Sequence, residues 1–176
     1  HFLADVHGEY EAFQHILKNA SGNIQRKVSE LFGNTMREAD LKELCTLIYY
    51  PDQKLELIKA SEPNINDWYH ITIHQLVSVC RLVSSKYTRS KVRKALPKDF
   101  SYIIQELLHE RTDDVNKTDY VNVIIDTIIT TGCADDFIIA ISNVIQRLAI
   151  DQLHILGDIY DRGPGAHIIM DTLSKY

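Results

Sequence analysis

Residues 153–163 read LHILGDIYDRG, an apolar run that ends at Gly157 and is followed within five residues by two aspartates and an arginine. The run is short and turn residues follow it at once, which predicts a buried strand over Leu153–Leu156. Asp158 then lies just beyond the carboxyl end of that strand, where open α/β sheets bind their ligands. We expect Gly157 and Gly163 to let the backbone turn tightly and come close to whatever is bound.

The polar residues of this stretch suit a site for a cation and a phosphate group. Clustered aspartates bind hard cations, and an adjacent arginine offers a planar fork that fits phosphate. Taken alone, the same residues fit a strand-to-helix turn with aspartate caps equally well. The other end of the chain decides between these two interpretations.

The first residues of the chain show a similar arrangement, in which polar residues directly follow an expected strand. His1–Ala4 are expected to form the end of a strand, and the turn after it holds Asp5 and His7. A carboxylate and an imidazole at one strand end can both reach a single metal ion, and this ligand pair suits Mn, Fe or Zn better than Ca. A helix is expected over residues 9–19, with the serine-glycine pair at 21–22 ending it.

Together, D-x-H at residues 5–7 and G-D-x-x-D-R-G at residues 157–163 resemble the first two motifs of the calcineurin-like metallophosphoesterase superfamily. The chain resembles class III fructose-1,6-bisphosphatase of Firmicutes more closely, over essentially its whole length and most clearly at residues 5–13, 84–97 and 157–172. About 150 residues separate the two motifs, a spacing typical of that class. In most superfamily members the two motifs lie much closer together.

The resemblance implies an α/β fold. This chain would hold part of a metallophosphoesterase sandwich, namely two parallel strands each followed by a helix, together with a large all-helical insertion. Residues 1–22 and 151–176 would form the partial catalytic domain, and residues 23–150 the insertion. Parallel strands joined by a crossover are expected to lie side by side, which would bring the two motifs together.

The resemblance also implies roles for the motif residues. Asp5 and His7 would hold one metal ion and Asp158 would bridge two, with Mn²⁺ as the metal of the family. Arg162 would bind the substrate phosphate, and Asp161 would be a catalytic residue that orients a histidine acid. The implied reaction is hydrolysis of fructose 1,6-bisphosphate in gluconeogenesis, by a cytoplasmic homo-oligomer.

Superfamily members also need a later G-N-H-[DE] motif and further metal-binding histidines, and the sequence contains no Asn-His pair. We therefore expect an N-terminal fragment of a longer phosphatase, inactive alone and with at most one weak metal site. Two other interpretations stay open. The parent could be another metallophosphoesterase, such as a Ser/Thr protein phosphatase with the same Asp-Arg-Gly, or the chain could be a non-catalytic helical binding or assembly module.

The segment between the motifs shows helical periodicity almost throughout. Apolar residues recur at i, i+3, i+4 and i+7, which predicts amphipathic helices that pack on a common core. The five clearest stripes are Leu41-Leu44-Cys45-Ile48, Tyr69-Ile73-Leu76-Cys80-Val83, Phe100-Ile103-Ile104-Leu107-Leu108, Val121-Ile124-Ile125-Ile128-Ile129 and Ile138-Ile141-Ile145-Leu148.

Composition narrows the class of protein. The net charge of −5 argues against a nucleic-acid partner, and no apolar run is long enough to span a membrane. Cys45, Cys80 and Cys133 each lie among apolar residues with no C-x-x-C pair, which predicts reduced, buried thiols and a cytoplasmic protein.

Two features of the insertion have more than one interpretation. His70 and His74 have a spacing that can bind a metal, but no H-E-x-x-H pattern is present, which favours an ordinary packed or surface pair. Six cations without an intervening acid lie between residues 86 and 98. They form either a solvated helix face or an anion site for a substrate phosphate or a phosphorylated effector. The six are Lys86, Arg89, Lys91, Arg93, Lys94 and Lys98.

Overall fold

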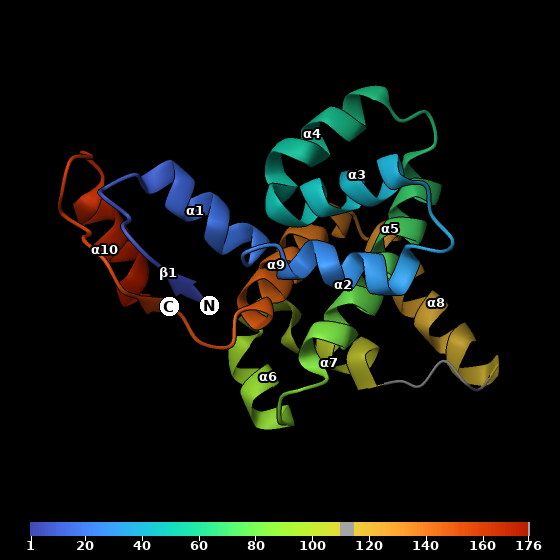
Figure 1. Ribbon diagram of the computed structural model, residues 1–176. Coiled ribbons are helices and arrows are strands. Elements are labelled where there is room, and N and C mark those ends of the chain that lie inside the picture. Colours follow the sequence, from blue (N-terminus) through green and yellow to red (C-terminus); the bar gives the residue numbers. More distant parts are fainter. Residues whose placement is uncertain (110–114, 176) are drawn as a thin grey trace.

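The computed structural model describes residues 1–109 and 115–175, which form helices and one two-stranded parallel sheet (Figure 1). The elements in chain order are β1 (Phe2–Leu3), α1 (Tyr10–Asn19), α2 (Asn23–Phe32), α3 (Glu38–Tyr49), α4 (Pro51–Ser61), α5 (Ile65–Ser84), α6 (Arg89–Ala95), the 3₁₀ helix η1 (Lys98–Phe100), α7 (Ser101–His109), α8 (Val115–Thr130), α9 (Ala134–Ala149), β2 (His154–Ile155) and α10 (Ala166–Ser174).

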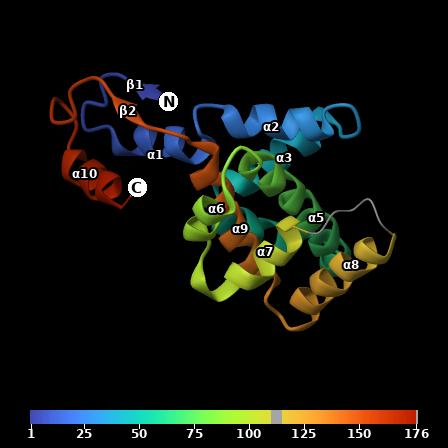
Figure 2. The ribbon, with the colours of Figure 1, turned by 90° about the horizontal axis from the view of Figure 1, so that it is seen from below.

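The strands, α1 and α10 lie to one side of a larger helical body (Figures 1 and 2). Helix α10 packs against α1, and α1 extends to the body, where it contacts α2, α3 and α9. The two strands come from opposite ends of the chain and pair in parallel, with Phe2 opposite His154 and Leu3 opposite Ile155. The prediction of two adjacent parallel strands, each followed by a helix, is confirmed.

The prediction of a buried strand over Leu153–Leu156 is wrong in two respects. The strand covers only His154 and Ile155, and Leu156 is 71% exposed. Successive side chains of a strand point to opposite faces of the sheet. Leu153 and Ile155 are half-buried, whereas His154 and Leu156 lie on an open face. Phe2 shares that face, and its ring stacks on His154 with centroids 4.9 Å apart.

The helical body is organised around α5 and α9, which pack along each other. All five apolar stripes contribute to one core, and Ile73, Leu76, Ile141 and Ile145 are fully buried within it. Burying one such side chain stabilises a fold by about 1.5–3 kcal/mol, so this contact dominates the stability of the body. Among the described residues, no helix combines the length and apolar character that crossing a bilayer requires.

Helices α2, α4 and α6 fall outside the five stripes, and each buries few apolar side chains. Helix α6 buries only Val92, and α4 buries only Pro51 and Leu55. Local capping fixes where such helices begin. Thr88 caps α6 by accepting a hydrogen bond from the main-chain nitrogen of Lys91, and Pro51 is the first residue of α4, where its missing N–H costs nothing.

The three thiols differ in burial, so the expectation that all are buried is wrong for Cys133, which is partly exposed. Burial raises the pKa of the Cys80 thiol to about 12 and also raises the pKa of Cys45. Because the thiolate is the reactive form, we expect only Cys133 to react quickly with Ellman's reagent in the folded chain. A Cys133→Ser variant should then show no fast-reacting thiol. Fast reaction of two or three thiols would contradict the core described here.

Candidate functional site

Main-chain hydrogen bonds join the loop after β1 to the loop after β2. The nitrogen of His7 donates to the carbonyl oxygen of Asp158 at 2.8 Å, and the nitrogen of Gly163 donates to the carbonyl of His7 at 2.6 Å. A third bond runs from the nitrogen of Gly165 to the carbonyl of Gly8 at 3.0 Å. The D-x-H loop and the G-D-x-x-D-R-G loop, far apart in sequence, therefore form one interlocked unit.

The glycines of the second loop are needed for this contact, and neither Gly157 nor Gly163 has a positive φ angle. The expected close approach of these glycines to a bound ligand stays a prediction. A Cβ atom on Gly157 would lie 2.2 Å from the nitrogen of Asp5 and 2.3 Å from its Oδ1. A Cβ atom on Gly163 would lie 2.4 Å from the carbonyl oxygen of His7. Both residues lie against the protein's own first loop, so any side chain there would push the two motifs apart.

Three of the predicted site residues have a strained backbone. Asp5, His7 and Arg162 have φ angles of 49°, 48° and 71°, in the left-handed region that non-glycine residues seldom adopt. Each such residue lowers the stability of the fold by of order 1–3 kcal/mol, and backbone strain of this kind is concentrated at functional sites. The surrounding hydrogen bonds between the two loops hold these residues in place.

The polar side chains of the unit lie near one another but are only loosely paired. His7 Nδ1 lies 3.7 Å from Asp161 Oδ2, beyond hydrogen-bond distance, and Arg162 Nε lies 3.3 Å from the same carboxylate. The Nδ1 atom of His7 is buried and has no hydrogen-bond partner among the residues that the structure describes. Asp5, Asp158 and Asp161 are exposed. An unsatisfied buried nitrogen at the edge of a group of carboxylates is a position that a ligand or cation would satisfy.

The fit to a metal ion is partial. The chemistry of the donors suits Mn²⁺, and the unpaired His7 nitrogen is what an imidazole ligand would present. Within the described part of the chain, however, no three His, Cys, Asp or Glu side chains converge closely enough to hold a metal ion. Binding of metal by Asp5, His7 and Asp158 therefore stays a prediction.

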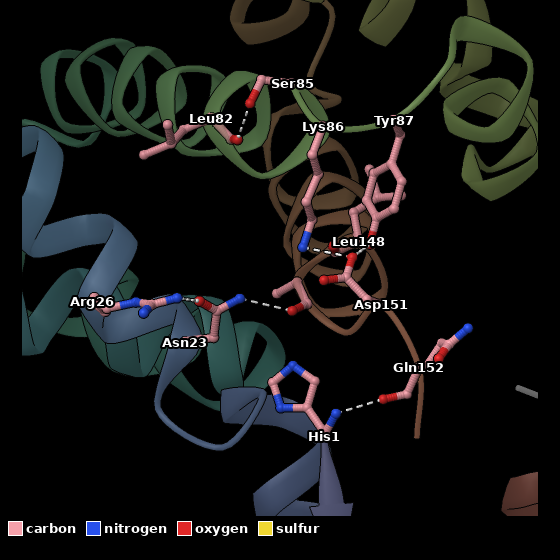
Figure 3. A network of polar contacts seen from close by, with 11 residues as sticks. His1, Asn23, Arg26, Leu82, Ser85, Lys86, Tyr87, Leu148, Asp151 and Gln152 are labelled. Carbon is pink, nitrogen blue, oxygen red and sulfur yellow. Dashed lines mark hydrogen bonds and ion pairs between the residues drawn. The ribbon is translucent and has the colours of Figure 1, made fainter. Parts of the chain in front are cut away.

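A second polar cluster, which no sequence motif indicated, fixes the entry to β2 (Figure 3). Asp151 accepts from Lys86 at 2.6 Å and from the Tyr87 hydroxyl, which also lies 2.9 Å from the Leu148 carbonyl. These contacts from Lys86 and Tyr87 lower the pKa of the Asp151 carboxyl. The next residue, Gln152, accepts a hydrogen bond at 2.7 Å from the main-chain nitrogen of His1.

His70 and His74 behave as the ordinary pair that the sequence favoured. Each faces α8: His74 Nε2 lies 2.9 Å from Asn122 Oδ1, and His70 Nε2 lies 3.4 Å from Asp126. Burial lowers the pKa of His74, so its neutral form is favoured.

Known proteins resemble this chain over its whole length. A family model described as Firmicute fructose-1,6-bisphosphatase matches residues 1–176. The chain belongs to the Firmicute fructose-1,6-bisphosphatase family. Its relatives named fructose-1,6-bisphosphatase class 3 include proteins of Bacteroides fragilis, Bacteroides thetaiotaomicron and Clostridium botulinum, which are 73%, 72% and 65% identical over all 176 residues.

The chain spans 26% of the length of each of these three relatives. No solved structure matches it. The fructose-1,6-bisphosphatase family is thus shown for this chain, whereas the activity of the whole protein is a matter for proposal.

Proposed function

We propose that this chain is part of a metal-dependent fructose-1,6-bisphosphatase that removes one phosphate from fructose 1,6-bisphosphate in the cytoplasm, as a step of gluconeogenesis. The strands and their two helices would belong to a metallophosphoesterase sandwich, with residues 23–150 inserted into it. The whole protein would act as a homo-oligomer. The observation that carries the proposal is the interlocking of the two motif loops through the 2.8 Å bond from His7 to Asp158, in a chain that matches the family throughout.

Each motif residue has a part in this proposal. Asp5, His7 and Asp158 would hold manganese ions, which supply Lewis-acid stabilisation of the charge that develops on the phosphoryl oxygens. Arg162 projects from a strained position and is largely exposed, so its guanidinium is accessible to a substrate phosphate. Asp161 lies near Arg162 and His7, at 3.3 Å and 3.7 Å, and its carboxylate would orient a histidine acid.

The proposal is tested by assaying the complete product of the encoding gene with Mn²⁺. Release of phosphate from fructose 1,6-bisphosphate is compared with release from phosphopeptides. We expect activity on the sugar bisphosphate only. Activity confined to phosphopeptides would instead identify a protein phosphatase, and activity on neither would favour a binding or assembly module.

The 176-residue chain alone is expected to show no detectable turnover of fructose 1,6-bisphosphate, even with excess Mn²⁺. Divalent ions need several fixed ligands to offset dehydration, and only three predicted ligands are present. Loss of a general acid alone costs roughly 10²–10⁴-fold in rate. A phosphate-release assay run beside a calorimetric Mn²⁺ titration measures both properties. Two tight sites with robust turnover would contradict the expectation.

A further inference from the structure

A pocket of about 210 Å³ opens where α6, the end of α9 and the segment before β2 meet. Three exposed cations line it, namely Lys91, Lys94 and Arg147, against a single carboxylate, that of Asp151. The chain as a whole carries a net charge of −5. The pocket is thus a local concentration of positive charge on an acidic protein.

The positive charge of the pocket is only partly compensated by Asp151, which interacts electrostatically with Lys91. Asp151 is already bound by Lys86, as Figure 3 shows. No ion pair connects Lys91, Lys94 or Arg147 to a carboxylate in the described part of the chain. The Lys91 ammonium instead lies 4.2 Å from the centre of the Tyr87 ring. Three cations that share one concave surface with a single carboxylate, which Lys86 already binds, attract an anion.

We propose that this pocket, lined by Lys91, Lys94 and Arg147, binds a small phosphate-bearing metabolite. Arginine offers a bidentate fork to phosphate, and two lysine ammonium groups supply further charge-assisted hydrogen bonds. The pocket is smaller than the roughly 300–1,000 Å³ of pockets for drug-sized ligands, so the ligand carries only a short carbon chain. Apolar residues at the pocket wall, including Ala95 and Leu153, provide contact for that carbon chain.

The pocket is separate from the candidate catalytic loops. Its lining ends at Leu153, before β2 begins, whereas Asp158 follows the other end of β2. A ligand here lies at the opposite end of the strand pair and is not the substrate's second phosphate. It would lie beside Gln152, whose carbonyl accepts the hydrogen bond from His1 at the entry to β2, and so acts as an effector of the strand pair.

The structure also divides the basic run between two roles. Lys86 neutralises Asp151, whereas Lys91 and Lys94 face the pocket. Arg89, Arg93 and Lys98 do not line it and remain exposed. Arg147, which contributes the guanidinium fork, comes from α9, more than 50 residues further along the chain, so no run of cations in the sequence included it.

The test is a titration of the 176-residue chain with inorganic phosphate and with glycerol 3-phosphate, followed by two-dimensional NMR at low ionic strength. We expect saturable shifts confined to residues 87–95 and 147–153, with tighter binding of the monoester and weaker binding as salt is added. Lys94→Gln and Arg147→Gln should each weaken binding roughly tenfold, as expected for loss of a hydrogen bond to a charged group. Lys98→Gln is the matched control from the same run and should bind like the wild type.

Several outcomes would overturn the proposal. If neither probe bound saturably, the pocket would not be an anion-binding site. An equal loss of affinity in the Lys98→Gln variant would show that only the general positive potential of this surface attracts the anion. Tighter binding of inorganic phosphate than of glycerol 3-phosphate would exclude a metabolite. Because the shifts are mapped on the wild-type chain, the result does not depend on whether the variants fold.

Discussion

Gly157→Ala is expected to lower the activity of the complete gene product on fructose 1,6-bisphosphate at least about a hundredfold, since a misplacement of about 1 Å can cost that much. The new methyl group would lie 2.2 Å from the nitrogen of Asp5 and 2.9 Å from its Cα. These are main-chain atoms, which cannot move aside as a flexible side chain does. The first loop must therefore shift, and Asp5 and His7 shift with it. Steady-state kinetics with saturating Mn²⁺ measures the effect.

The matched control is Gly132→Ala, at the turn between α8 and α9. Apart from its chain neighbours, no described residue has an atom within 4 Å of a Cβ placed there, although its φ of +76° disfavours alanine. We expect Gly132→Ala to lose about 1–2 kcal/mol of stability and to keep its activity. Circular dichroism should show native helix content for both variants. Wild-type activity of Gly157→Ala would mean that the contact between the loops does not shape the site.

Asp158→Asn is expected to lower the activity of the complete gene product more than about a hundredfold, because replacing a residue that merely supports a metal ligand already costs about 10–100-fold. The amide removes the negative charge that would bridge two cations. The bond from His7 is accepted by the main-chain oxygen of residue 158, so the loop is expected to keep its shape. The measurement is the dependence of kcat on Mn²⁺ concentration.

Asp171→Asn on α10 serves as the control for Asp158→Asn, since Asp171 is exposed and lies on a helix of the same part of the molecule. Its kinetics should match those of the wild type. If Asp158→Asn retained the wild-type response to Mn²⁺, the carboxylate of Asp158 would not be a metal ligand.

The sequence predicted those features that periodicity or a motif reports. The isoleucine stripes of α8 and α9 identified core helices, because a repeat near 3.6 places apolar side chains on one face. The two motifs identified the paired strands and the loops that follow them. Short helices with few buried residues, such as α6, gave no comparable signal.

Contacts between distant residues that lack a motif could not be predicted. Asp151 meets Lys86 and Tyr87 across more than 60 positions, and Arg147 joins the pocket from a different helix. The role of Gly157 could not be predicted either. The sequence shows that Gly157 has no side chain, but not which atoms occupy the space that a side chain would fill. No local sequence pattern indicated that the face of the sheet with Phe2 and Leu156 is exposed.

The register of the strand pair has a consequence for the order of folding. Phe2 pairs with His154 about 150 residues away, whereas each helix forms from neighbouring residues. Closing a flexible loop of that length costs about 4 kcal/mol in chain entropy, and two-residue strands return little of it. We therefore expect the helical body to fold first and to bring both chain ends toward each other through the contact of α1 with α9. The two motif loops then meet last, so partial unfolding should separate them before it disturbs the helices.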